Sequence, residues 1–187
     1  MLDRALSFVR DALDSHLQRS LSLSEPVAVL NHLHHSDSGS SQKNQNRLIM
    51  SLIKIEQDSS RQYYNAQLKK NATFSKLPPQ FFNINVLMAA NFDDYLESLK
   101  VLSQVILFFQ ANSSFQRASY PNLPEELNLL EIEVEATPDV KSFEIWGALG
   151  TSYVPSIIYK IRRLIVDSHQ IAGFQTPLRQ PVTEVGQ

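Results

Sequence analysis

The segment from Asn91 to Phe115 constrains the fold most, because it combines helical periodicity with an unusually apolar composition. Asp93 is its predicted N-cap, since a carboxylate there can accept a hydrogen bond from a free backbone N–H of the first turn. The second half of the segment is apolar on all sides, so we expect the helix to bury more than one face. The predicted core face has apolar residues at intervals of three and four: Tyr95, Leu96, Leu99, Leu102, Val105, Ile106 and Phe109.

The flanking sequence supplies a sheet and two further helices. An amphipathic helix is predicted at the start of the chain, and a short helix is predicted over 140–149, ended by Gly150 as a C-terminal cap. Alternating or β-branched apolar residues predict strands over 25–33, 47–57, 81–90, 127–136 and 156–168. The resulting order, α-β-β-β-α-β-α-β, indicates an α+β fold with helices packed on an antiparallel or mixed sheet.

A single α+β domain is predicted over residues 1–168, followed by an extended C-terminal tail over 169–187. With 187 residues, of which 43% are apolar, the chain can bury a substantial core. The tail is rich in proline, glutamine and glycine and has no periodicity, so we do not expect it to fold alone. Two polar segments, 34–46 and 59–79, are predicted to be loops.

Composition argues against several classes of function. The net charge is −2, from 17 basic and 19 acidic residues, whereas a dedicated nucleic-acid-binding protein usually has a strong basic excess. The absence of cysteine excludes thiolate chemistry and is compatible with a cytoplasmic protein. The first residues carry charges throughout, and the longest apolar run, 105–109, is far shorter than the ~20 residues of a membrane helix. We therefore expect neither a secretory signal nor membrane insertion.

The titratable residues do not form a recognisable catalytic or metal-binding motif. His32, His34 and His35 form the only histidine cluster, which we interpret as a strand end that runs into a polar loop, because zinc sites need three or four placed ligands. The alternating glutamates over 131–135 are typical of a solvated strand face. No sequence pattern combines a nucleophile, a base and an oxyanion donor. We predict no enzymatic activity, no cofactor and no metal.

Basic residues within the last predicted strand are candidates for an interface. Lys160 and Arg162 share one face of this strand, with Arg163 expected on the opposite face. Charges inside an apolar strand are unfavourable unless they are paired. They therefore indicate either an exposed face with extended side-chain stems or an ion pair between subunits. Aromatic and basic residues in the segment 59–79 are also compatible with an interface, or with a loop that folds back on its own domain: Tyr63, Tyr64, Lys69 and Lys70.

Three segments carry a resemblance to a known family: LIMSLIKIEQ, FNINVLMAANFDDYLESLKVLSQVILFFQANSSF and FEIWGALGTSYVPSIIYKIRRLIVD. The motif Ala90-Asn91-Phe92 before the apolar helix, and the run from Trp146 to Gly150, resemble tube-terminator, or cap, proteins of contractile injection systems. These systems are phage-tail-like particles, including antifeeding prophages and insecticidal virulence cassettes. The resemblance covers roughly residues 1–168, and the chain departs from it in the polar loop 36–46 and in the tail.

The resemblance implies a phage tail-terminator-like fold and a structural role. Its members form a six-fold ring at the end of the inner tube farthest from the baseplate, where the ring ends tube polymerisation and helps to fix the sheath. The implied partners are further copies of the chain in a hexamer, the inner tube protein and the sheath protein. The alternative is a neck or adaptor component that anchors the particle to a membrane or to another factor. A small-ligand-binding domain or an enzyme is disfavoured by the missing catalytic motif.

Overall fold

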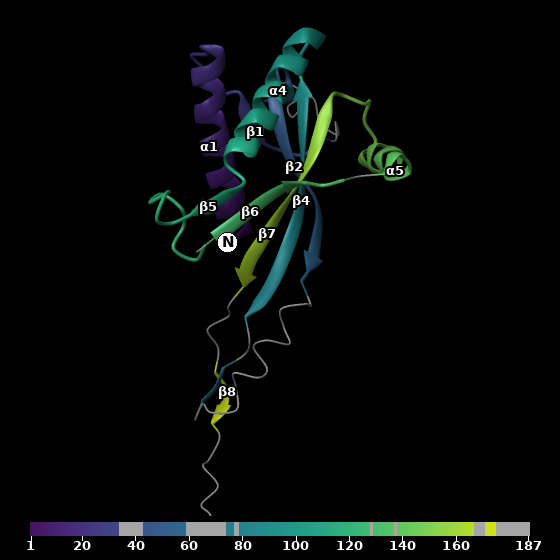
Figure 1. Ribbon diagram of the computed structural model, residues 1–187. Helices are drawn as coiled ribbons and strands as arrows, with labels where there is room; N and C mark the ends of the chain where they lie inside the picture. Colours follow the sequence, from purple (N-terminus) through teal and green to yellow (C-terminus); the bar gives the residue numbers. More distant parts are fainter. Residues whose placement is uncertain are drawn as a thin grey trace, which may run out of the picture.

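The computed structural model describes residues 1–33, 43–58, 74–76, 79–127, 129–136, 138–166 and 171–174. These residues form a mixed six-stranded sheet with helices on both faces (Figure 1). The predicted α+β class and the predicted order of the longer elements are confirmed, and β3, β5 and β8 are additional short strands. The elements are α1 (Leu2–Leu21), β1 (Ala28–Leu30), β2 (Arg47–Gln57), β3 (Phe74–Lys76), β4 (Gln80–Asn91), α4 (Tyr95–Ala111), β5 (Ser114–Gln116), β6 (Leu129–Val134), α5 (Asp139–Leu149), β7 (Ser156–Val166) and β8 (Ile171–Phe174).

The long strands β2, β4 and β7 lie next to one another in the sheet, whose order is β1-β2-β4-β7-β6-β5. The neighbouring strands are antiparallel except β1, which pairs with β2 in parallel at one edge. β3 and β8 form a separate antiparallel pair. Residues 171–174, from the predicted tail, therefore pair with residues 74–76, from a segment that was predicted to be a loop.

Alternating residues of the central strands separate the molecule into two cores. On the inner face of the sheet, Ile84, Val86 and Met88 of β4 are buried beneath α1 and α4 (Figure 1). On the outer face, Leu87 and Ala89 of the same strand belong to a smaller cluster that includes residues of α5. The predicted amphipathic helix at the start of the chain is confirmed, because α1 buries Leu6, Val9, Leu13 and Leu17 on one side and leaves Leu2 half-buried. The predicted cap of α5 is also confirmed, because Gly150 ends this helix with a φ of 62°.

The N-cap of α4 is Asp94, so the predicted cap at Asp93 is wrong by one residue. The Asp94 carboxylate accepts a hydrogen bond from the backbone N–H of Leu96 at 2.9 Å. The Asp93 carboxylate instead accepts a hydrogen bond of 3.1 Å from the Asn46 amide, and the Asp93 N–H donates to the Asn46 side-chain oxygen at 3.0 Å. Asp93 thus ties the start of α4 to the turn that precedes β2.

The predicted core face of α4 is wrong for most of its residues. The helix buries Ser98, Val101, Val105, Phe108 and Phe109. Only Val105 and Phe109 of the predicted face are among them, although Leu102 is half-buried. The remaining predicted core residues, Tyr95, Leu96, Leu99 and Ile106, are exposed. The helix is rotated about its axis relative to the prediction, and part of its apolar surface faces outward.

Candidate assembly surfaces

Two β-bulges shape the outer face of the sheet, defined as the face that carries α5. The register between β2 and β4 shifts between Leu52 and Lys54, and the register between β4 and β7 shifts opposite Asn83. At the second shift, Arg163 has a φ of 68°, a left-handed conformation that a bulge can accommodate. The inserted residue returns Leu164 to the inner core and places Arg163 beside Arg162 on the outer face. The prediction that Arg163 lies on the opposite face is therefore wrong.

Acidic and basic side chains alternate across the outer face, and we call them the outer charge network. Lys160 Nζ lies 3.2 Å from Glu56 Oε2 and 3.9 Å from Glu135 Oε2. Arg162 Nη1 lies 3.4 Å from Glu133 Oε1, and Arg163 Nε lies 2.6 Å from Glu131 Oε2. The network comprises Lys54, Glu56, Glu131, Glu133, Glu135, Lys160, Arg162 and Arg163. The three basic residues predicted as interface candidates are thus neutralised within their own chain.

Glu56 of β2 joins two strands of this network, because it pairs with Lys54 on its own strand and with Lys160 on β7. Hydrogen bonds from Lys54 and then from Lys160 hold the pKa of Glu56 below its ordinary value. A lowered folded-state pKa means that this interaction stabilises the fold above the unfolded pKa and is lost as the pH falls through the folded-state value. Asn83 and Asn85 lie between the charged rows on β4, both buried, and their side-chain oxygens accept no hydrogen bond from any described residue. This surface is therefore built around charge pairing at neutral pH.

An apolar stripe runs along the outward side of α4, and we call it the α4 stripe. Tyr95 and Leu96 each expose 63% of their surface, in the first turn of the helix. The stripe comprises Tyr95, Leu96, Leu99, Ile106 and Leu107. Contiguous exposed apolar residues of this kind are typical of interaction surfaces. The apolar circumference of the helix was visible in the sequence, but not which side of it would remain exposed.

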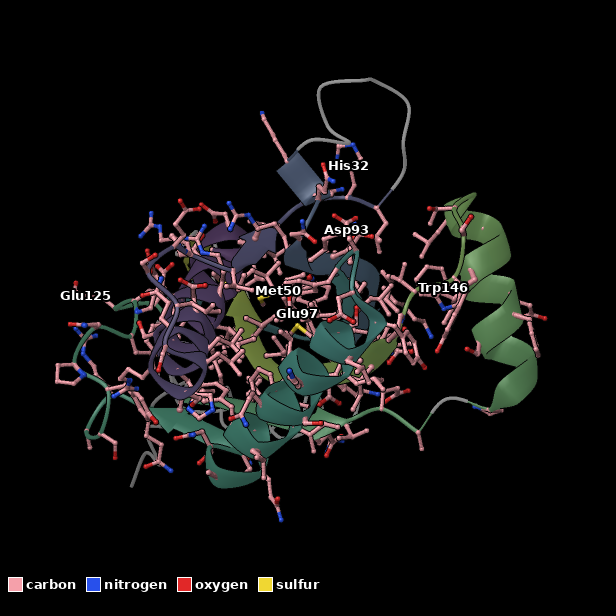
Figure 2. All side chains as sticks on the ribbon, turned by 90° about the horizontal axis from the view of Figure 1, so that it is seen from above. His32, Met50, Asp93, Glu97, Glu125 and Trp146 are labelled. Carbon is pink, nitrogen blue, oxygen red and sulfur yellow. The ribbon has the colours of Figure 1, made fainter. Side chains whose placement is uncertain are left out.

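Helix α5 presents a second apolar projection on the other side of the sheet. Phe143 is 80% exposed, the highest value among the exposed large apolar side chains of the described residues. Trp146 lies on the side of α5 that faces the sheet (Figure 2), where it packs on the small outer cluster. Its ring stacks edge-on against the exposed Tyr153, with ring centroids 5.2 Å apart. Phe143 was missed as a candidate site residue, because a single aromatic in a short helix gives no signal of its exposure.

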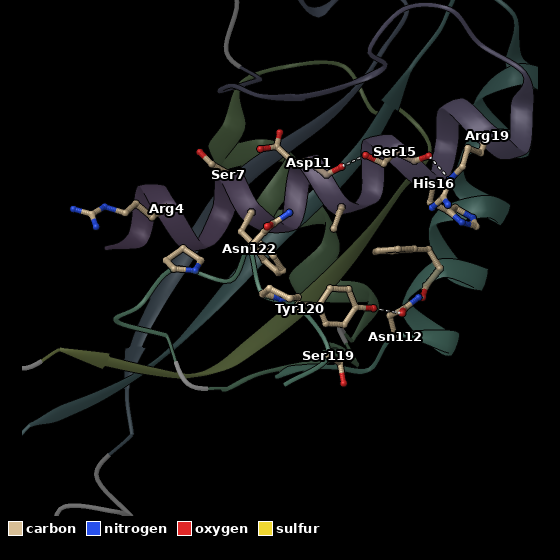
Figure 3. Close-up of a pocket in the computed structure, with 15 residues that line it drawn as sticks. Arg4, Ser7, Asp11, Ser15, His16, Arg19, Asn112, Ser119, Tyr120 and Asn122 are labelled. Atoms are coloured by element: carbon tan, nitrogen blue, oxygen red, sulfur yellow. Dashed lines mark hydrogen bonds between the residues drawn. The ribbon is translucent and has the colours of Figure 1, made fainter. Parts of the chain in front are cut away.

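A groove of about 660 Å³ lies between α1, the end of α4 and the loop over 119–124 (Figure 3). Its polar side chains make mostly local contacts: Ser15 Oγ donates to the carbonyl of Asp11 at 2.8 Å, and the Tyr120 hydroxyl donates to Asn112 at 2.6 Å. His16 stacks on Phe108 with ring centroids 5.2 Å apart. This imidazole also lies 3.3 Å from the Ser20 hydroxyl, one turn along the exposed helix, and no described carboxylate orients it. Among the described residues, the groove thus shows local hydrogen bonds and a ring contact rather than a paired acid and base.

Several residues of the remaining predicted sites lie outside the part of the chain that the structure describes. His32 is exposed, whereas His34 and His35 lie outside the described residues. Among the residues that are described, no group of three or more His, Cys, Asp or Glu is arranged to hold a metal ion. No described helix has the length and apolarity needed to cross a bilayer. The predicted interface residues Tyr63, Tyr64, Lys69 and Lys70 also fall outside the described ranges, and their role stays a prediction.

The fold has relatives among protein families and solved structures. The family model described as the Pvc16 N-terminal domain matches residues 6–180. One similar structure is the sheath/tube terminator of an extracellular contractile injection system, PVC, in its extended state, with a TM-score of 0.54 and 18% identity over 96% of this chain and 62% of that chain. Another is the tube-terminating cap of the anti-feeding prophage, with a TM-score of 0.51 and 18% identity over 95% of this chain and 60% of that chain. No curated protein sequence matches.

These structural similarities extend over nearly the whole of the chain but not over the whole of the matched proteins. The chain spans 60% to 62% of the length of the two solved structures. At 18% identity, the similarity shows a shared fold. The α+β sheet with helices on both faces is therefore an architecture that these two proteins share with this chain.

Proposed function

Because the chain belongs to the family described as the Pvc16 N-terminal domain, we propose that it is a structural cap subunit of a contractile injection system. In this proposal, six copies form a ring at the baseplate-distal end of the inner tube, end tube polymerisation and help to fix the sheath. The partners are the tube protein and the sheath protein, and assembly takes place in the cytoplasm. The observation that carries the proposal is the fold shared with a tube terminator and with a tube-terminating cap over at least 95% of the chain.

The surface of the chain supports a subunit that is completed by its neighbours. The α4 stripe and Phe143 leave large apolar side chains in water, which is unfavourable for a protein that works alone. The same surfaces fit a structural role better than an enzymatic one, since the described residues form no acid–base site. The names of both similar structures favour a terminator over the alternative of a neck or adaptor component.

Deleting the gene from a producing strain tests this function, with electron microscopy of the purified particles as the measurement. We expect tubes of uncontrolled length, because nothing stops subunit addition at the distal end. Complementation with the intact chain should restore one narrow length distribution. Tubes of normal length that fail to anchor would instead support the adaptor alternative and contradict the terminator role.

We also propose that Lys160, Arg162 and Arg163 lie at the contact with a neighbouring subunit or with the inner tube. Since each of them is paired within the chain, a partner must supply carboxylates that compete with those of the outer charge network. In the same proposal, residues 1–168 form the domain and 169–187 an extended tail, of which β8 already has a pairing partner in β3. Tyr63, Tyr64, Lys69 and Lys70 are proposed for the same contact.

Charge reversal at Arg162 tests whether this residue lies at the contact with a neighbouring subunit or with the inner tube. Arg162→Glu should weaken ring assembly or tube binding, because it places a negative charge beside Glu133 and repels an acidic partner. Arg117→Glu is the matched control, since Arg117 also forms an exposed ion pair, at 3.2 Å from Glu125. Both variants should change the free energy of unfolding by less than about 1 kcal/mol, as is typical of exposed pairs. Equal assembly of the two variants by mass photometry would remove Arg162 from the interface.

A further inference from the structure

The two exposed apolar helical faces lie on opposite sides of the sheet. The α4 stripe belongs to the helix on the inner face, and Phe143 belongs to the helix on the outer face (Figure 1). Because they lie on opposite sides of the sheet, these two surfaces do not form one patch that could meet its own copy across a two-fold axis. They can form a head-to-tail contact, in which each copy offers one surface to the copy before it and the other to the copy after it. Contacts of this kind close into rings when the rotation between copies permits.

We propose that Phe143 of one copy inserts into the α4 stripe of the next copy and that this contact links the ring. This inference rests on the proposed function, because it supplies the contact that a ring of identical subunits needs. The partner is a second copy of the chain, and its chemistry is an apolar aromatic ring packing between apolar residues of successive helical turns. The contact adds an interaction surface that differs from the outer charge network.

The outward side of α4 has residues at the spacing that can surround an inserted aromatic side chain. Residues separated by three, four and seven positions surround a hole on a helix surface, into which a side chain of a facing helix packs. Leu99, Leu102, Ser103 and Ile106 have this spacing, with Leu102 half-buried beside the α4 stripe and the other three exposed. The Ser103 hydroxyl donates to the Leu99 carbonyl at 2.8 Å. The hydroxyl therefore already donates a hydrogen bond within the helix, so an apolar ring can cover Ser103 without leaving a buried donor unsatisfied.

The surroundings of Phe143 permit close approach of a second helix. Gly147 lies one turn along α5 from Phe143, on the exposed side. A Cβ added at Gly147 would meet no atom within 4 Å in the chain itself. Glycine inside a helix is less favourable than alanine by about 1 kcal/mol, and no packing contact among the described residues requires glycine at this position. An approaching helix would benefit from the missing side chain.

The charges beside the two surfaces are complementary. Lys100 flanks the α4 stripe and is exposed, and Glu144 follows Phe143 on α5 and is exposed. Within the described part of the chain, neither of these two residues forms an ion pair, unlike the residues of the outer charge network. When Phe143 packs against the α4 stripe, a basic residue of one copy and an acidic residue of the other lie at the edge of the contact. Opposite charges at an interface rim orient the partners and suppress alternative docking.

Disulfide trapping tests the contact directly, because the chain contains no cysteine. The double variant Ser103→Cys with Phe143→Cys is assembled into particles, oxidised and run on a non-reducing gel. We expect a ladder of dimers, trimers and larger species, because each copy bonds to the next. A mixture of the two single variants should give dimers only. Bond formation requires Cα atoms within about 7 Å, so a ladder reports true contact.

Two controls keep the result specific. A mixture of Phe143→Cys with Ser119→Cys, an exposed serine near the groove of Figure 3, should remain unlinked. In the cross-linking background, Lys100→Glu should slow cross-linking about tenfold, and adding Glu144→Lys should restore it. Particles of normal tube length that contain the double variant but show no ladder would overturn this contact and leave the proposed function standing. If the double variant is missing from particles that do take up the Ser103→Cys single variant, the Phe143 ring is itself needed for assembly, as the contact predicts. Particles that never contain the intact chain would instead contradict the proposed function.

Discussion

Replacing Phe115 by alanine is expected to lower the free energy of unfolding by about 3–5 kcal/mol, the range for removing a large aromatic from a core. Phe115 is fully buried in β5, at the point where α1, α4 and the sheet meet. Its ring packs edge-on against Phe8 with centroids 5.5 Å apart, and against Tyr120 at 4.9 Å. It also lies 6.2 Å from the Phe108 ring of α4. Alanine would leave a cavity bounded by three elements that cannot all collapse into it.

Urea unfolding followed by circular dichroism measures this loss. The matched control is Phe143→Ala, the same substitution at a site that is 80% exposed. It should change the free energy of unfolding by less than about 0.5 kcal/mol, since surface substitutions outside special sites have effects of this size. Equal losses at the two positions would mean that Phe143 is buried in the isolated chain. The pair therefore separates residues that hold the fold from residues that we assign to assembly.

The strands of this chain could be predicted because each central strand has faces of different character. In β4, Ile84, Val86 and Met88 alternate with Asn83, Asn85 and Leu87, so the sequence indicated both the strand period and the face that packs in the core. In β6, Leu130 and Ile132 are buried as their alternation with glutamates predicts, whereas Val134, predicted on the same face, is 56% exposed. Strands β3, β5 and β8 have only three or four residues, which is too short for a periodic signal.

Helix α4 could be predicted as a helix, but its orientation could not. Apolar residues cover most of its circumference, so several rotations about the axis would bury a similar area. The packing partner decides between them: α1 and the sheet contact the side that includes Val101 and Phe108, and leave Leu96 and Leu107 outside. A sequence pattern therefore identified the helix that carries the candidate surface while assigning part of that surface to the core.

For the outer charge network too, the sequence predicted the residues but not their geometry. Its basic residues were identified as candidates because charges within an apolar strand need partners. Their partners and the side of Arg163 depend on strand register and on the bulge at Arg163, which inserts one residue into the alternation. Neither register nor bulge is encoded in the period of a single strand. Long-range pairing thus fixed the geometry of a site whose composition was already visible.

Replacing Asp14 by alanine is expected to lower the free energy of unfolding by about 2–4 kcal/mol, because two hydrogen bonds to a charged acceptor are lost. Asp14 lies on α1, and its Oδ1 accepts from the backbone N–H groups of Val27 at 2.7 Å and Ala28 at 2.8 Å. Its Oδ2 accepts from Gln18 at 2.9 Å. The carboxylate therefore fixes the edge strand β1 to the first helix. Alanine would leave the N–H groups of two buried residues, Val27 and Ala28, without this acceptor.

Chemical denaturation measures the total effect, and amide hydrogen exchange at Val27 and Ala28 locates it. Exchange at both amides should accelerate more in Asp14→Ala than in Asp14→Asn, because the asparagine oxygen can still accept from them. The control is Asp11→Ala, one turn earlier. Its side chain is 66% exposed and pairs with Arg10, so its loss should stay below about 1 kcal/mol. Unchanged protection of the two amides in Asp14→Ala would show that β1 is held by its pairing with β2 and by burial alone. In that case Asp14 would be dispensable for the edge of the sheet, and the helix and the strand would be joined only through their apolar contacts.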